Sequence, residues 1–165
     1  MRENTAMHPS AQKHIYDYFI DDQGNWFCEG NPVTDPQLFR LLSRSLYQQD
    51  GRYYVRCEGE INPVRVAAFP LWIRYVHVET DAGGNLTAVD IELQDGRREA
   101  LAPHTLRTAS DEALYCRATH RRLKARFAKV AYYELTRYLQ MDAESSRFYF
   151  VIDGRRYDVL PDAEG

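Results

Sequence analysis

The sequence predicts an α+β fold, mostly antiparallel sheet with two principal helices. Aromatic-rich segments alternate with polar residues at period two, which is typical of strands, and two stretches carry leucine or alanine at helical spacing. A third observation is an internal echo of residues 35–64 at residues 129–159. The echo favours two duplicated hairpin–helix–hairpin halves about a pseudo-two-fold axis, because one repeat unit cannot bury its apolar face alone. Any two amphipathic helix-plus-hairpin segments could also align this way, so chance similarity stays open.

The echo consists of a helical stripe followed by an aromatic hairpin. The pairs are Leu38, Leu42 and Leu46 with Ala131, Leu135 and Leu139; Ser43-Arg44 with Thr136-Arg137; Tyr53-Tyr54 with Phe148-Tyr149; Glu58-Gly59 with Asp153-Gly154; and Val64 with Val159. We expect residues 1–12 to be disordered and residues 13–162 to form a single compact domain. Its halves are about 14–68 and 113–160, joined by a meander at 71–101.

The first half begins with a hairpin that turns at residues 22–25 and returns through Trp26. Asp35 then suits a helix N-cap, because its carboxylate can accept orphan backbone N–H groups, and Pro36 suits the first turn. This helix is predicted to run to about Tyr47. Strands are expected at residues 53–57, 64–68, 71–79, 86–93 and 98–101. Residues 103–111 read as irregular.

The second half has one ambiguous element. Residues 113–118 predict a strand, and residues 121–127 alternate, which favours a strand leading into a helix over 128–140. One continuous helix from about Thr119 competes with this interpretation, because Ala, Lys, Arg and Leu are good helix formers. The last element is clear: Asp153-Gly154 between aromatic and apolar runs indicates a two-residue type I′ hairpin.

The motifs now collected resemble a family of bacterial and mitochondrial domains of unknown function, numbered forty-five-zero-five. The match lies in Tyr16-x-Tyr18-Phe19-x-Asp21-x-Gln23-Gly24 with Phe27, in Asp35-Pro36-Gln37-Leu38, in Ser43-Arg44, in Gly51-Arg52-Tyr53, in Cys57, Glu60, Asn62 and Pro70, and in Ala131 and Glu134-Leu135. More distantly, the hairpin Asp21 to Phe27 is similar to that of the bacterial family of unknown function numbered twelve-eighty-five. These are turn and core residues, so the resemblance implies a fold and no chemistry.

Charge is distributed unevenly along the chain. The net charge is −3, but residues 113–133 hold six Lys and Arg and no Asp or Glu. Removing those six positive charges from the total leaves −9 on the rest of the chain. Three widely spaced cysteines argue against a disulfide framework, and no apolar stretch is long enough for a signal peptide or a membrane span. We therefore expect a soluble, cytoplasmic protein with no membrane association.

The basic segment is the candidate site for an anionic partner, either an acidic protein or a nucleic acid. Its residues are Arg117, His120, Arg121, Arg122, Lys124, Arg126 and Lys129. On a strand, Arg122, Lys124 and Arg126 would form a ladder that grips phosphates, with Tyr115, Phe127, Tyr132 and Tyr133 near enough to stack bases. Two alternatives explain the same pattern without a partner. The segment could be a solvent-exposed edge strand, or its cations could pair with acidic residues elsewhere in the chain.

Catalysis and metal binding have weaker signals. No nucleophile motif, phosphate loop or zinc spacing occurs, since Cys116 and His120 form no CxxC or HxxxH pair. We expect no cofactor, no metal and no catalytic residue, and interpret the chain as a non-enzymatic binding or interaction module, a monomer or a homodimer. A small-molecule-binding protein or enzyme with a pocket between the two halves is the alternative.

Overall fold

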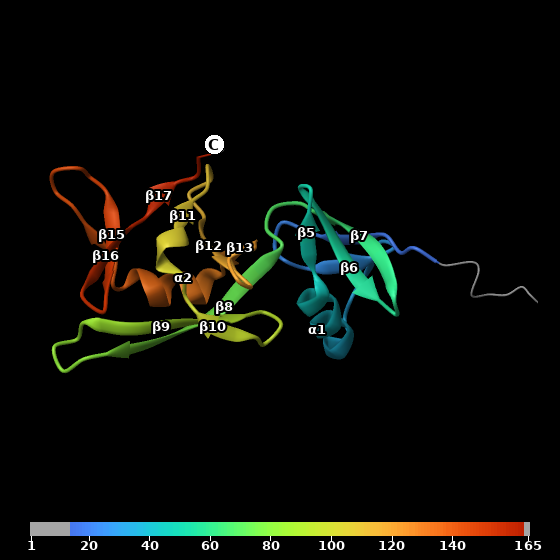
Figure 1. Ribbon diagram of the computed structural model, residues 1–165, viewed down its shortest axis with the longest axis horizontal. Helices are drawn as coiled ribbons and strands as arrows, with labels where there is room; N and C mark the ends of the chain where they lie inside the picture. The colour runs from blue at the N-terminus through green and yellow to red at the C-terminus, as the bar shows by residue number, and fades with distance from the viewer. Residues whose placement is uncertain (1–13, 164–165) are drawn as a thin grey trace, which may run out of the picture. The chain divides into compact units, whose positions relative to one another are not determined.

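The described residues form two compact units. The computed structural model describes residues 14–163, and these divide into unit 1, up to Ala68, and unit 2, from Phe69 (Figure 1). Two α-helices and many short strands confirm the α+β class. The expectation of one compact domain over 13–162 stays a prediction, and the predicted disorder of residues 1–12 falls outside the described residues.

Unit 1 is one six-stranded mixed sheet with a helix. The strand order is β4-β3-β2-β7-β6-β5, in which β2 and β7 run parallel and the other neighbours run antiparallel. The elements are β2 (Tyr18–Ile20), β3 (Trp26–Cys28), β4 (Asn31–Pro32), α1 (Pro36–Ser45), β5 (Tyr47–Gln49), β6 (Arg52–Cys57) and β7 (Glu60–Val66).

Helix α1 begins as predicted and ends earlier. The Asp35 carboxylate accepts the N–H of Gln37 at 3.0 Å, so it caps the helix as expected. The helix stops at Ser45, because Tyr47 joins strand β5 instead and pairs with Tyr54, their rings stacked at 5.7 Å. The prediction that the helix reaches about Tyr47 is therefore wrong, because Tyr47 begins strand β5. The helical spacing of Leu38, Leu42 and Leu46 gave no sign of this strand.

Unit 2 contains a seven-stranded sheet in the order β10-β9-β8-β13-β12-β11-β17 and a three-stranded sheet in the order β14-β15-β16. The pairs β8–β13 and β11–β17 are parallel. The elements are β8 (Leu71–Thr80), β9 (Leu86–Leu93), β10 (Arg98–Ala100), η2 (Pro103–Thr105), β11 (Arg107–Thr108), β12 (Leu114–Ala118), β13 (Leu123–Phe127), α2 (Lys129–Thr136), β14 (Gln140–Met141), β15 (Phe148–Ile152), β16 (Arg155–Asp158) and β17 (Leu160–Pro161).

The ambiguous segment is a strand followed by a short helix. β13 pairs with β12 and β8, which bury Leu123, Ala125 and Phe127, so the period-two pattern decides against a helix from Thr119. Helix α2 ends at Thr136, four residues before the predicted Gln140, which instead begins β14. Residues 103–111, predicted irregular, contain the 3₁₀ turn η2 and strand β11.

Several of the echoed positions share a local conformation. Both hairpin turns have two consecutive left-handed residues, with φ of 54° and 79° at Glu58-Gly59 and of 51° and 77° at Asp153-Gly154. This is the type I′ geometry predicted for the second of them. Outside the echoed ranges, the loops at Asp21 and Asp81 match each other, because each carboxylate accepts backbone N–H groups two and four residues later.

The apolar stripes predicted for the helices reach the core. Leu42 on α1 and Ala131 and Leu135 on α2 have no exposed surface. In the last hairpin Phe150 faces Tyr157 across the strands, as predicted, and is fully buried. Neither helix of the described residues has the length and apolar character that crossing a bilayer requires. Cytoplasmic location stays a prediction.

Candidate anion-binding cleft

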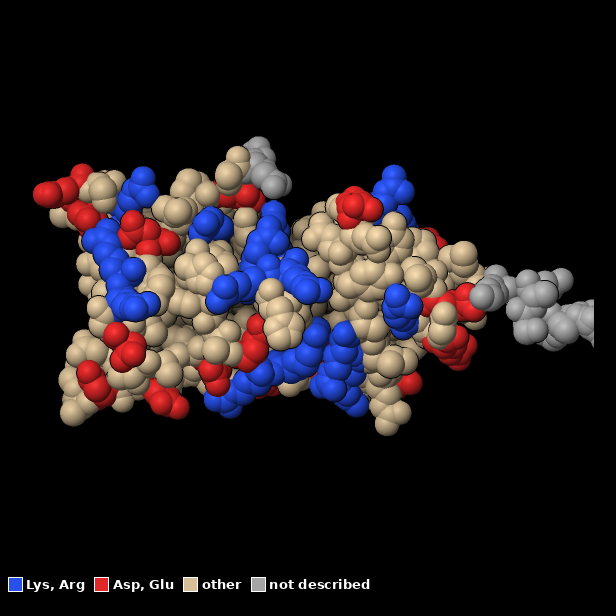
Figure 2. Space-filling model, in the orientation of Figure 1, with Lys and Arg blue, Asp and Glu red and all other residues tan. Residues whose placement is uncertain are grey.

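The basic segment folds into a β-hairpin and the first residue of a helix. β12 carries Arg117, the connecting turn of residues 119–122 carries His120, Arg121 and Arg122, β13 carries Lys124 and Arg126, and α2 begins at Lys129. Along β13 the basic side chains alternate with buried apolar ones, so the ladder expected from the sequence points away from the core. Figure 2 shows Lys and Arg side chains gathered over the region of β12 and β13.

The turn of this hairpin has an unusual backbone. Three consecutive non-glycine residues are left-handed, with φ of 53° at Thr119, 60° at His120 and 66° at Arg121. The left-handed conformation costs an L-residue roughly 1–2 kcal/mol, and it persists only where surrounding contacts impose it. Two contacts do so here. The N–H of Arg122 donates to the carbonyl of Ala118 at 3.0 Å, and the N–H of Thr119 donates to both carboxylate oxygens of Glu99, at 3.2 and 3.1 Å.

Two cations of the ladder already have carboxylate partners. Lys124 Nζ lies 3.6 Å from Asp162 Oδ2, and Arg126 Nη1 lies 3.5 Å from Asp111 Oδ2. The Arg126 guanidinium also lies 5.2 Å from the centre of the Trp72 ring. An opposite charge this close lowers the attraction that a distant anion feels, so these two residues contribute less to an anion site than their number suggests.

The remaining cations gather at a cleft within unit 2. The cleft has a volume of about 640 Å³, inside the range of small-ligand pockets. Three arginines, two histidines and one glutamate are among its lining residues: Arg97, Arg117, Arg121, His104, His120 and Glu99. Residues 100–103 and the ring of Tyr157 add an apolar wall. Arg122 and Lys129 are exposed and are not part of the lining.

The turn, β10 and η2 enclose this cleft because hydrogen bonds join them. Glu99 on β10 accepts from Thr119, as described, and Thr105 Oγ1 accepts the N–H of Arg117 at 3.0 Å. The end strand of the sheet is thereby brought to the β12–β13 turn. The contact explains why residues about twenty positions apart share one site.

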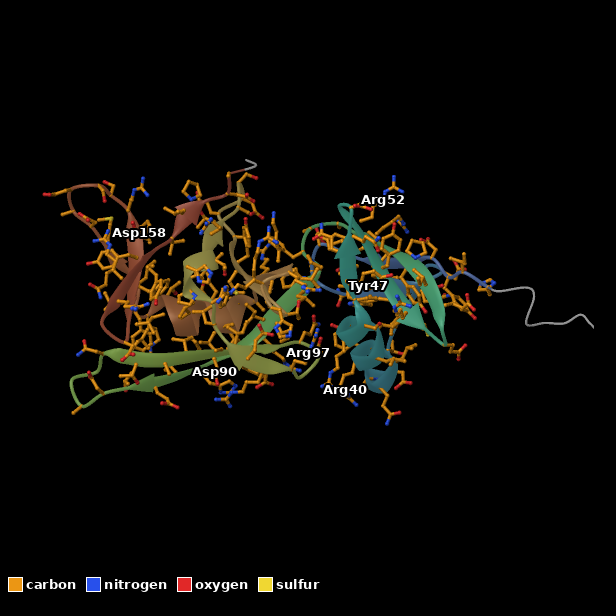
Figure 3. The ribbon with its side chains drawn as sticks, viewed as in Figure 1. Arg40, Tyr47, Arg52, Asp90, Arg97 and Asp158 are labelled. Atoms are coloured by element: carbon orange, nitrogen blue, oxygen red, sulfur yellow. The ribbon has the colours of Figure 1, made fainter. Side chains whose placement is uncertain are left out.

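Arg97 is held in the cleft by an ion pair with a buried carboxylate. Its Nη2 lies 2.7 Å from Oδ2 of Asp95, and its Nε lies 3.1 Å from Oδ1 of the same carboxylate, whose side chain is fully buried. Figure 3 labels Arg97 at the turn between β9 and β10. Removing Arg97 would leave a buried charge without this partner, at a cost of roughly 3–5 kcal/mol. No signal in the sequence singled out Arg97, since Asp95-Gly96 indicates only a tight turn.

Arg117 and Arg121 are the cations of the lining that lack a carboxylate partner. Among residues 14–163 neither forms an ion pair. Glu99 is the one carboxylate in the described lining, and both of its oxygens face the Thr119 amide. The cleft therefore offers an anion more charged donors than its own carboxylate can occupy.

The aromatic residues expected to stack bases divide into two groups. Tyr115 and Phe127 are 3% and 4% exposed, so they cannot meet a base. Burial, together with the hydrogen bond to Asp162, raises the pKa of Tyr115 to about 12. Tyr132 and Tyr133 on α2 are exposed and lie edge to face at 5.5 Å. Neither belongs to the lining of the cleft.

The three cysteines lie on separate strands, β3, β6 and β12. Cys116 is fully buried, and this burial raises the pKa of its thiol. Burial also raises the pKa of Cys28, which contacts the phenol of Tyr18. Thiols held in their neutral form are poor nucleophiles and poor metal ligands.

Comparison with known proteins identifies structural relatives. No protein-family model matches the chain, and no curated protein matches it. A DUF1285 family protein from Silicibacter pomeroyi DSS-3 is similar over 98% of this chain and 92% of its own, with a TM-score of 0.69 and 18% identity. A DUF1285 family protein from Shewanella baltica OS155 is similar over 73% of this chain and 90% of its own, with a TM-score of 0.58 and 18% identity.

This likeness shows the fold. It confirms at the level of structure the similarity to the twelve-eighty-five family that the first hairpin indicated. The resemblance to the forty-five-zero-five family stays a prediction. DUF1285 denotes a family of unknown function, so the relatives assign no chemistry to the cleft.

Proposed function

We propose that the protein is a non-enzymatic binding module that engages an anionic partner through the cleft beside the β12–β13 turn. The observation that carries the proposal is the pair Arg117 and Arg121, which line the cleft without a carboxylate partner among residues 14–163. Guanidinium groups form short, charge-assisted and often bidentate hydrogen bonds with phosphate and carboxylate oxygens. An anion bound in the cleft would therefore accept hydrogen bonds from the guanidinium groups of Arg117 and Arg121.

The proposal assigns unequal roles to the seven predicted residues. Arg117, His120 and Arg121 form the cleft, and Arg97 and His104 join them there. Lys124 and Arg126 hold the hairpin to nearby carboxylates. Exposed Arg122 and Lys129 add a field that steers anions toward the surface without contacting them in the cleft.

The test measures binding of three anion classes to the ¹⁵N-labelled full chain by NMR. The probes are inorganic phosphate, a short single-stranded oligonucleotide and a poly-glutamate peptide, and the readout is the amide shifts of residues 119–124. We expect at least one probe to give saturable shifts that weaken with salt. Arg117→Ala/Arg121→Ala should abolish them.

The matched control is Arg40→Ala/Arg52→Ala, which removes the same charge from unit 1. Both of these arginines are exposed, labelled in Figure 3, and outside every ion pair among the described residues. The control should bind like the wild type. Absence of shifts with all three probes, or equal losses in the two double variants, contradicts the proposed function.

A further inference from the structure

The shape of the cleft limits the kind of anion it can hold. Resting on the function proposed above, we infer that its ligand is a small phosphate monoester with an apolar or aromatic body. The phosphate would meet Arg117 and Arg121, and the body would lie on the apolar wall of residues 100–103 and Tyr157. This names a ligand class for the same site.

The distribution of unpaired cations disfavours a long polyanion. A nucleic-acid strand is held by a continuous row of Lys and Arg along its backbone. On β13 that row is interrupted, because Lys124 and Arg126 are already 3.6 and 3.5 Å from carboxylates. Tyr115 and Phe127 are buried, so they offer no stacking platform beside it. The arginines without a carboxylate partner, Arg117 and Arg121, line a cleft of about 640 Å³ instead.

The donor set favours phosphate over a single carboxylate. A carboxylate has two oxygens and one negative charge, which one guanidinium fork can satisfy. A phosphate monoester has three terminal oxygens and a charge of nearly −2 at neutral pH, so it can engage two forks at once. Arg117 and Arg121 line the cleft and provide two forks.

The apolar wall favours an ester over the free ion. Leu101, Ala102 and Pro103 line the side of the cleft that follows β10, and Tyr157 adds a ring from β16. An inorganic ion would leave this surface in contact with water. An apolar body of a few carbon atoms would bury it, and each buried methylene contributes about 0.8 kcal/mol.

Isothermal titration of the full chain tests the inference with phenyl phosphate, inorganic phosphate and benzoate. We expect phenyl phosphate to bind one to one and about tenfold more tightly than either of the others, because inorganic phosphate lacks the apolar body and the carboxylate of benzoate engages only one guanidinium fork. Arg117→Ala/Arg121→Ala should weaken it by about 10- to 100-fold, the effect of losing a charged hydrogen bond. Arg40→Ala/Arg52→Ala should leave the affinity unchanged.

A second variant tests the apolar wall without touching charge. Tyr157→Ser should weaken phenyl phosphate and leave inorganic phosphate unaffected. If phenyl phosphate binds no better than inorganic phosphate, the ligand class is wrong although the anion site stands. If the oligonucleotide binds through Arg117 and Arg121 and phenyl phosphate does not, the proposed function also survives. If no anion binds, both proposals fail together.

Discussion

Replacing His120 with glycine is expected to stabilise unit 2. His120 has φ of 60°, a conformation that costs an L-residue roughly 1–2 kcal/mol and that glycine adopts freely. Glycine also gains conformational freedom in the unfolded chain, which takes back roughly 0.5–1 kcal/mol. The net gain is therefore between about 0 and 1.5 kcal/mol, centred near 0.75 kcal/mol. The side chain of His120 is exposed, so its loss removes little packing.

Arg122→Gly is the control at an exposed position of the same turn. Arg122 is outside the set of left-handed residues, so glycine there brings only the entropic cost and should destabilise by roughly 0.5–1 kcal/mol. Native-state hydrogen exchange of the β13 amides measures both changes. We expect exchange to slow by about two- to fivefold in His120→Gly and to accelerate in Arg122→Gly. Equal acceleration in both variants would refute the claim that the turn is strained.

Three other outcomes follow from burial and hydrogen bonding. Phe150→Ala should destabilise unit 2 by about 3–5 kcal/mol in urea unfolding, because the ring is fully buried. Cys116 should resist a thiol reagent until the protein unfolds, whereas Cys28, which is partly exposed, should react and do so faster as pH rises toward its raised pKa. Hydrogen bonds from backbone N–H groups lower the pKa of the Asp21 and Asp81 carboxyls. The stability that these hydrogen bonds add is therefore complete above about pH 4 and is lost below it as each carboxyl protonates. Titration of the two carboxyl groups by NMR measures both pKa values.

The sequence predicted best those elements whose signals are local. The type I′ turn at Asp153-Gly154 and the cap at Asp35 depend on two to four adjacent residues, and both formed as expected. The period-two pattern of residues 121–127 correctly outweighed their high helix propensity, because burial against β12 and β8 rewards alternation. Strand β5 was not predicted. It follows α1 after a single residue, so its sequence was assigned to the helix.

The cleft was only partly predictable. Clustering in the sequence identified Arg117, His120 and Arg121, which the fold brings to one cavity. Nothing local indicated that Asp162 and Asp111 would pair with Lys124 and Arg126, because both contacts depend on how distant segments meet. The left-handed backbone of the β12–β13 turn was not predicted either. Its sequence, Thr-His-Arg, contains neither glycine nor asparagine, the residues that most often adopt this conformation.

The bond between Glu99 and Thr119 has a dynamic consequence. β10 is a three-residue strand at the end of its sheet, and such margins open with far less free energy than the interior does. When β10 frays, the Thr119 amide loses its acceptor and the turn is free to relax. The shape of the arginine-lined cavity therefore depends on a short pairing at the edge of the sheet. A ligand that bridges the two sides of the cavity would hold this edge strand in place.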